Sequence, residues 1–179
     1  HGRWLFVHNG LVNDFHAIRR DLLMALDSES VAEIQGSTDS EVVFHLALSY
    51  GLEQDPIAAV ESALGHVEEA LRRHGIEPAL QASIGVSDGE RIWAVRYASA
   101  DRPRTLFTSA DVDALRKLDP ENPRLQMLRE GDRVIVSEPF ADLPGAWHEI
   151  PESMALIVDA EGGHETRPFR PKVAIQARA

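Results

Sequence analysis

The fold class is decided by residues 82–97, which run ASIGVSDGERIWAVRY. Apolar, β-branched and aromatic residues fill both arms of this stretch, and Asp88-Gly89 lies between the arms. An Asp-Gly pair flanked by apolar runs is a strong short-range signal for a β-hairpin, because both turn residues accept a positive φ. The stretch therefore predicts two antiparallel strands, 82–86 and 92–97, joined at Asp88-Gly89.

Further short apolar runs predict that the hairpin belongs to a larger sheet. Each of them is typical of a strand, and they occupy residues 4–7, 105–108, 133–137 and 154–158. Residues 111–118 predict one short helix among these strands, and 119–123 predict a loop because prolines interrupt them. We expect the final residues, 165–179, to form an extended tail.

Between the first apolar run and the hairpin, the spacing of apolar residues becomes helical. Helices are predicted at 15–26, 38–50 and 55–74, and a polar loop or frayed turn at 27–35. Thr38 followed by Glu41 has the form of a capping box. Asp55-Pro56 is typical of a helix start, and Asp14 is the predicted N-cap of the first helix.

Helical and strand patterns occupy different parts of the chain. Apart from the first apolar run, the helices fall within 14–75 and the strands within 80–160. This segregation predicts an α+β fold in which helices pack on antiparallel sheet. A doubly wound parallel sheet is not predicted, because strict alternation of strands and helices is absent. No strong linker divides the chain, so we expect a single domain over 1–179.

Composition limits the classes of function. The chain has 179 residues, with 18 Lys and Arg against 29 Asp and Glu, which gives a formal charge of −11. Such acidity argues against binding to nucleic acid or to an anionic membrane. No apolar run approaches the length of about 20 residues that a membrane span needs, so a cytoplasmic protein is expected. We expect no metal and no organic cofactor.

The chain contains no cysteine. This composition excludes a disulfide framework, a thiolate metal site and a thiol nucleophile within these residues. No Walker-type or His-Glu-x-x-His motif occurs either. Chemistry must therefore be sought in less conspicuous residues.

Asn9-Gly10, at the end of the first apolar run, is the first candidate site. Asn-Gly between apolar runs favours a plain hairpin turn. The same dipeptide offers two neutral donors, the Asn9 carboxamide and the Gly10 backbone N–H, which could both point at a developing oxyanion. Losing one such donor typically costs on the order of 10²–10³ in rate. The residues alone leave both interpretations open.

Asp39 is the second candidate, within Gly36-Ser37-Thr38-Asp39-Ser40-Glu41. One interpretation is that Asp39 and Glu41 are acidic residues of a first helical turn, where the helix dipole favours them. The other is that Asp39 binds the ammonium group of an amino-acid substrate, with which a carboxylate pairs well in a partly closed site. The sequence does not choose between them.

Together, the two candidate segments give the chain a family resemblance. The order of its segments resembles that of class II glutamine amidotransferases, which are N-terminal-nucleophile hydrolases. The segments are Trp4-Leu5-Phe6-Val7-His8-Asn9-Gly10, then an amphipathic helix, then residues 36–41. The later segments 136–140 and 147–151 are similar to the smaller branch of that family. This branch includes bacterial γ-glutamyl hydrolases and stand-alone glutaminase-like proteins.

The resemblance implies a fold and a site. The fold is an αββα sandwich, with two antiparallel sheets between helical layers. Asn9, through its side-chain amide, and Gly10, through its backbone N–H, would form the oxyanion hole, and Asp39 would bind the substrate's α-amino group. The nucleophile of the family is a cysteine at the mature N-terminus, whose own α-amine serves as base.

The implied reaction is hydrolysis of an amide. Attack on the side-chain amide carbon of glutamine, or of a γ-glutamyl small molecule, gives an oxyanion, then a thioester, then glutamate and free ammonia. A synthetase that uses the ammonia, or the remaining N-terminal segment of the same enzyme, is the implied protein partner. The residues imply no metal and no cofactor for this chemistry.

The sequence departs from the family pattern in one decisive respect, because it has no cysteine. We expect a fragment whose nucleophile lies upstream of His1, so that the sandwich lacks its first strands. The alternative is a non-catalytic binding or assembly module that keeps the amidotransferase scaffold. A third hypothesis is an unrelated α+β domain, in which Asn9-Gly10 is a hairpin turn and Asp39 is a helix cap.

Overall fold

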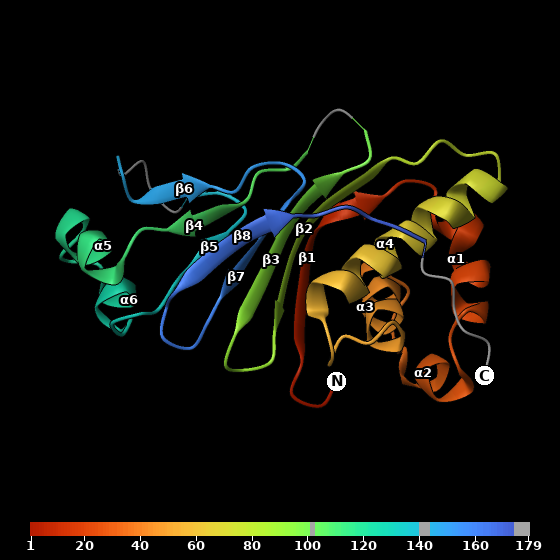
Figure 1. The fold of residues 1–179 in the computed structure, drawn as a ribbon, viewed down its shortest axis with the longest axis horizontal. Coiled ribbons are helices and arrows are strands. Elements are labelled where there is room, and N and C mark those ends of the chain that lie inside the picture. The colour runs from red at the N-terminus through yellow and green to blue at the C-terminus, as the bar shows by residue number, and fades with distance from the viewer. Residues whose placement is uncertain (101–102, 140–143, 174–179) are drawn as a thin grey trace. The chain divides into compact units, whose positions relative to one another are not determined.

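The structure is a computed structural model that describes residues 1–100, 103–139 and 144–173. The chain divides into two compact units (Figure 1). One consists of His1–Asn9, Ala82–Tyr97 and Pro103–Pro168 and is called the sheet unit. The other consists of Gly10–Gln81, Ala98–Arg102 and Phe169–Ala179 and is called the helical unit.

The helical unit contains the predicted helices. They are α1 (Phe15–Met24), α3 (Asp39–Ser49) and α4 (Pro56–Arg73), and a short helix α2 (Ser28–Glu33) lies between the first two. The Asp55 carboxylate accepts hydrogen bonds from the N–H groups of Ile57 and Ala58, which confirms the predicted start of α4. Asp14 stands at the N-cap position of α1 but has a left-handed backbone and makes no capping hydrogen bond.

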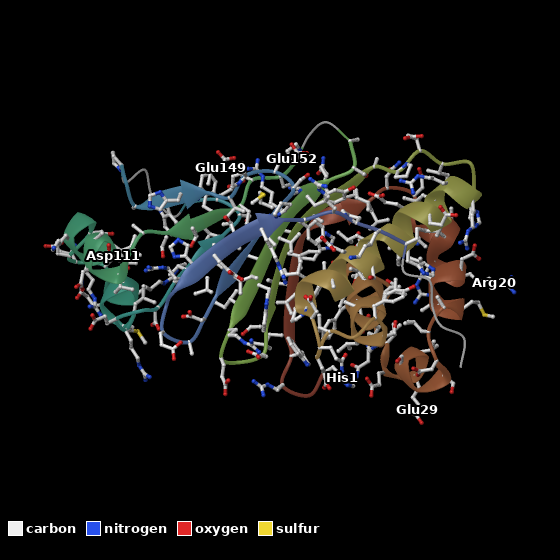
Figure 2. The ribbon with its side chains drawn as sticks, in the orientation of Figure 1. His1, Arg20, Glu29, Asp111, Glu149 and Glu152 are labelled. Atoms are coloured by element: carbon white, nitrogen blue, oxygen red, sulfur yellow. The ribbon has the colours of Figure 1, made fainter. Side chains whose placement is uncertain are left out.

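Helices α1, α3 and α4 pack against one another (Figure 1). The apolar side chains that helical spacing predicted on their inner faces are fully or almost fully buried, among them Ile18, Leu22, Val43, Leu46, Val60, Leu64 and Leu71. Charged side chains such as Arg20 and Glu29 are exposed and extend away from these helices (Figure 2). The burial pattern explains why hydrophobic spacing located these helices correctly.

Two antiparallel sheets belong mainly to the sheet unit. The first has the strand order β1-β2-β3-β7-β8, with bounds Leu5–Val12, Leu80–Ser87, Ile92–Ala98, Met154–Val158 and His164–Pro168. The hairpin β2–β3 turns at Asp88-Gly89 as predicted, and Gly89 has a φ of 91°. Strand β7 pairs antiparallel with both β3 and β8.

The second sheet has the order β5-β4-β6, with bounds Ile135–Val136, Phe107–Ser109 and Trp147–Glu149. Apolar residues of the first sheet and residues next to the strands of the second share one buried cluster, formed by Ala94, Leu106, Ile150, Leu156 and Val158. Arg96 of β3 joins the sheets, because its guanidinium donates to the Glu149 carboxylate and to the Ile150 carbonyl, both at 2.7 Å. Helices α5 (Val112–Leu118) and α6 (Pro123–Gln126) complete this unit.

Several local expectations need correction. Segment 27–35 contains helix α2, which Asp27 caps, and part of the predicted loop at 119–123 begins helix α6, which Asn122 caps. Strand β6 was not predicted. The first strand extends to Val12 instead of ending at residue 7.

The segment 165–179 is not a tail over its described part. It begins within strand β8, and Phe169 is completely buried. Beyond it, the backbone N–H groups of Arg170 and Lys172 bond to Glu61 of α4, and a side chain on Gly65 would collide with the backbone of Lys172. Residues 174–179 lie outside the described part of the chain. Packing against α4 therefore holds residues 169–172 in place.

Candidate functional site

Strand β1 carries Asn9 and Gly10, the two predicted oxyanion donors. The strand runs from Leu5 to Val12 without interruption, so both residues lie inside it. Neither has a positive φ, which the two-residue turn favoured by Asn-Gly would require. The plain hairpin turn suggested by the dipeptide is therefore wrong.

Asn9 lines a cavity of about 600 Å³ within the sheet unit. Side chains alternate along a strand, and the exposed members of β1 are Leu5, Val7, Asn9 and Leu11. The cavity walls come from β1, from the β2–β3 hairpin, from Leu106 and from residues 135–138. Most of these walls are apolar. A carboxamide in such surroundings can orient a ligand by hydrogen bonding, as the few polar groups of binding pockets do.

Asp39 is the first residue of α3, and its carboxylate connects α3 to β1. Its Oδ2 accepts a hydrogen bond from the Val12 N–H at 2.9 Å. Its Oδ1 accepts from the N–H of Ser40 at 2.7 Å and from the Ser40 hydroxyl at 3.3 Å. The N-cap of α3 is Thr38, whose hydroxyl accepts from the Glu41 N–H at 3.3 Å. Asp39 is therefore not the cap of α3.

The Asp39 carboxylate contacts β1 at Val12, which lies two residues beyond Gly10 in the strand. Sequence reasoning did not find this contact, because nothing local marks the Val12 N–H as a partner of a residue 27 positions away. Among the described residues that line the cavity of Asn9, neither Gly10 nor Asp39 occurs. The convergence of all three residues on one cleft stays a prediction.

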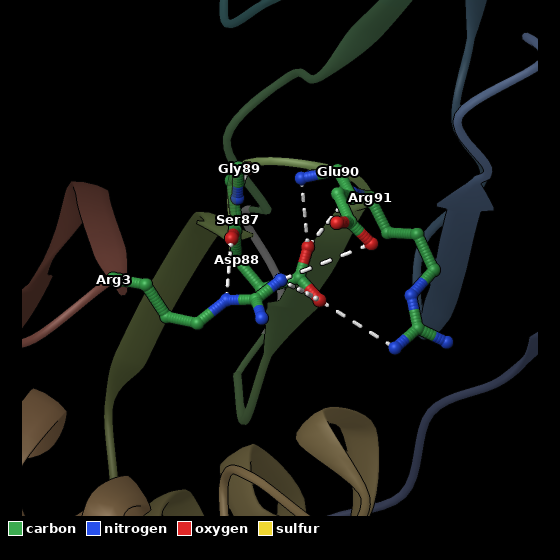
Figure 3. Close-up of polar contacts among 6 residues, drawn as sticks. All are labelled: Arg3, Ser87, Asp88, Gly89, Glu90 and Arg91. Atoms are coloured by element: carbon green, nitrogen blue, oxygen red, sulfur yellow. Dashed lines mark hydrogen bonds and ion pairs between the residues drawn. The ribbon is translucent and has the colours of Figure 1, made fainter.

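The start of β1 is anchored to the β2–β3 turn by Asp88 (Figure 3). Arg3 donates from Nε to the Asp88 carbonyl at 2.8 Å and forms an ion pair with its carboxylate at 3.3 Å. The same carboxylate accepts from the N–H groups of Glu90 and Arg91 at 3.0 and 2.8 Å. This side chain is only 6% exposed. The sequence identified Asp88 as a turn residue but not as the partner of Arg3.

The surroundings of Asp88 change its acidity. Burial alone would raise the pKa of its carboxyl group. The N–H donors of Arg91 and Glu90 and the charges of Arg3 and Arg91 act in the opposite direction and together lower this pKa. Asp88 therefore remains an anion that fixes the beginning of the strand on which Asn9 lies.

A second polar pair lies between α3 and α4. The Tyr50 hydroxyl and Nδ1 of His66 are 2.6 Å apart in a hydrogen bond. Burial lowers the pKa of His66, and the positive charge of Arg73 lowers it further, whereas Glu69 raises it. Burial raises the pKa of Tyr50. No sequence motif marked this pair.

No metal site accompanies these residues in the part of the chain that the structure describes, where no group of three or more His, Asp and Glu is arranged to hold an ion. None of the described helices could span a lipid bilayer. The three candidate residues, Asn9, Gly10 and Asp39, offer a carboxamide, a backbone N–H group and a carboxylate.

A solved structure decides the family. The glutamine aminotransferase class-II domain protein from Silicibacter pomeroyi is 35% identical and matches with a TM-score of 0.78, over 96% of this chain and 69% of that one. The chain belongs to the class II glutamine amidotransferases. The predicted α+β fold class, that of N-terminal-nucleophile glutamine amidotransferases with antiparallel sheets, is thereby confirmed.

The chain is also similar to two other amidotransferases. A probable glutamine amidotransferase of Saccharomyces cerevisiae, DUG3, is 27% identical over 176 residues, which cover 86% of this chain and 49% of that protein. This amidotransferase chain thus spans about half the length of the curated relative it matches. The glutamine phosphoribosylpyrophosphate amidotransferase from B. subtilis shares the fold. It is 16% identical, with a TM-score of 0.55, and the match covers 95% of this chain and 30% of the B. subtilis chain. No family model matches the sequence.

Proposed function

We propose that this amidotransferase domain hydrolyses the side-chain amide of glutamine, or of a γ-glutamyl amide, through a thioester on a cysteine located upstream of His1. The observation that carries the proposal is the bond from Val12 to Asp39, which holds a carboxylate beside the end of the strand that contains Asn9 and Gly10. The names of the relatives support glutamine as the substrate. A synthetase that accepts the ammonia is a further part of the proposal.

The proposed role of Asp39 is to bind the α-ammonium group of the substrate. An ionised carboxylate offers about four lone-pair positions, and Val12 and Ser40 supply three donors. One acceptor position remains for an ammonium N–H, and a charge-assisted bond of this kind is about twice as strong as a neutral one. Asp39 therefore selects substrates that carry a free α-amine.

The proposed role of Asn9 and Gly10 is to stabilise the oxyanion. The cysteine thiolate attacks the amide carbon, and the π electrons of the carbonyl move onto its oxygen, which accepts from the Asn9 carboxamide and the Gly10 N–H. The carbonyl re-forms, and the amine leaves with the proton that the cysteine's α-amine took from the thiol. Water then adds to the thioester and releases glutamate and the thiol. Each donor contributes on the order of 10²–10³ in rate.

The experiment is an assay of the complete polypeptide for glutamate release from glutamine and from γ-glutamyl amides. We expect turnover that disappears when the N-terminal cysteine is replaced by alanine. The 179 residues contain no cysteine, which is the observation that favours the second candidate, a non-catalytic binding module. A complete polypeptide that has no N-terminal cysteine and releases no glutamate would favour that module.

A further inference from the structure

Glu41 holds the segment that leads into α3. Its Oε1 accepts a hydrogen bond from the Gln35 N–H at 2.8 Å, and its Oε2 accepts from the Gly36 N–H at 2.7 Å. In an ordinary capping box, the glutamate returns to the N–H of the N-cap residue, here Thr38. Glu41 instead reaches two and three residues further upstream. Its two bonds therefore fix a loop, which capping of the helix alone does not require.

The peptide groups around Gly36 are held from both sides. While Glu41 accepts from the Gly36 N–H, Nη2 of Arg19 on α1 donates to the Gly36 carbonyl at 3.3 Å. Only Ser37 and Thr38 separate this fixed residue from Asp39. The conformation of the loop at 35–38 therefore determines the direction from which the chain reaches Asp39.

The carboxylate of Glu41 also occupies the space beside the Cα of Gly36. A Cβ on Gly36 would lie 2.8 Å from Oε2 of Glu41, closer than real contacts allow. The φ of Gly36 is not in the positive range that requires glycine, so the backbone itself accepts alanine. A side chain on Gly36 would therefore push the flexible end of Glu41 out of this position.

We infer that Glu41 is a positioning residue, which fixes the loop at 35–38 so that Asp39 presents its carboxylate to the α-ammonium group of a γ-glutamyl substrate. This inference rests on the proposed function. Without the two bonds, the loop samples several conformations, and only a fraction of molecules hold Asp39 in the binding geometry. The apparent affinity for a substrate that uses Asp39 then falls by that fraction. A substrate without the α-amine is unaffected.

The test compares two substrates in the complete, cysteine-bearing polypeptide. One is glutamine, and the other is glutaric acid monoamide, in which hydrogen replaces the α-amino group. Glu41→Gln removes the charge and one acceptor, whereas Gly36→Ala displaces the same carboxylate by sterics. Glu53→Gln, at an exposed carboxylate in the loop before α4, is the matched control.

We expect both Glu41→Gln and Gly36→Ala to raise the KM for glutamine about tenfold, as loss of a charge-assisted hydrogen bond does, with little change in kcat. The kcat/KM for the monoamide stays at the wild-type level in both variants, and Glu53→Gln changes neither substrate. Equal losses on the two substrates, or a wild-type KM for glutamine in Glu41→Gln, would overturn the positioning role.

Amide hydrogen exchange separates this inference from the proposed function. The N–H groups of Val12 and Ser40 bond to Asp39, so their exchange reports its position without any substrate. In Glu41→Gln we expect faster exchange at these two amides and at Gln35 and Gly36. If the wild-type protein releases no glutamate, the proposed function fails. Unchanged exchange at Val12 and Ser40 in Glu41→Gln would by itself refute the positioning of Asp39 by Glu41.

Discussion

Replacing Asp39 with asparagine tests the proposed substrate contact most directly. The substitution keeps the shape of the side chain and removes its charge. One asparagine oxygen can still accept from Val12 or from Ser40, but the amide nitrogen repels an ammonium group instead of binding it. We therefore expect a specific defect with substrates that carry an α-amine.

The size of the defect follows from the kind of bond that is lost. A hydrogen bond between charged groups contributes about 1.5–3 kcal/mol, and every 1.4 kcal/mol corresponds to about a factor of ten. The KM for glutamine should therefore rise between about 10-fold and about 150-fold. The ammonium group is bound equally in the ground state and the transition state, so kcat should change little.

The assay is steady-state release of glutamate or glutarate by the complete polypeptide with glutamine and with glutaric acid monoamide. Asp113→Asn, at a side chain 67% exposed on α5, makes the same chemical change elsewhere as a control. Wild-type kinetics with the monoamide and a raised KM with glutamine are the expected pair of results for Asp39→Asn. Equal impairment with both substrates would refute the reasoning and leave Asp39 with a structural role only.

Three further predictions concern stability. Gly65→Ala should lower the free energy of unfolding by about 1–3 kcal/mol, because the new methyl group meets the backbone of Lys172. Denaturant unfolding of the variant measures this loss. Since alanine favours helices, a gain in stability would contradict the packing. Asp88→Asn should lower the free energy of unfolding by about 1 kcal/mol at neutral pH, a small value because the arginine partners of Asp88 are more than half exposed. This loss should vanish in acid, where the wild-type carboxylate is itself protonated. The pKa of His66 is lower in the folded protein than its ordinary value of 6.5, so the unfolded chain binds more protons. The free energy of unfolding should therefore fall as the pH drops below about 6.5. His66→Gln should flatten that part of the pH profile, and an unchanged slope would exclude His66 as its source.

Elements with strong local signals were predictable. Helix α4 begins at Asp55-Pro56 with the expected cap, and the β2–β3 hairpin turns at Asp88-Gly89. Both depend on residues that are close in sequence, and the burial of one helical face adds to the signal. Helix α6 also carried a local signal, Asn122 followed by Pro123 at its first position, but the two prolines of that stretch favoured a loop.

Elements that depend on distant partners were not predictable. Strand β8, with sequence HETRP, is mostly exposed and has no apolar alternation, and its pairing with β7 is what makes it a strand. Asn9-Gly10 has the local preference of a turn, yet the pairing of β1 in the sheet keeps it extended. In both places tertiary contacts override local propensity.

The sequence by itself determined the candidate groups, Asn9, Gly10 and Asp39, and the family to which their order points. Only the tertiary structure showed that Asp39 bonds to Val12 on the strand that carries the other two residues, and that Glu41 holds the loop before it. The physical reason is that chemical identity and helical or strand spacing are local properties of a chain. A hydrogen bond between residues 27 positions apart exists only after packing has brought the two segments together.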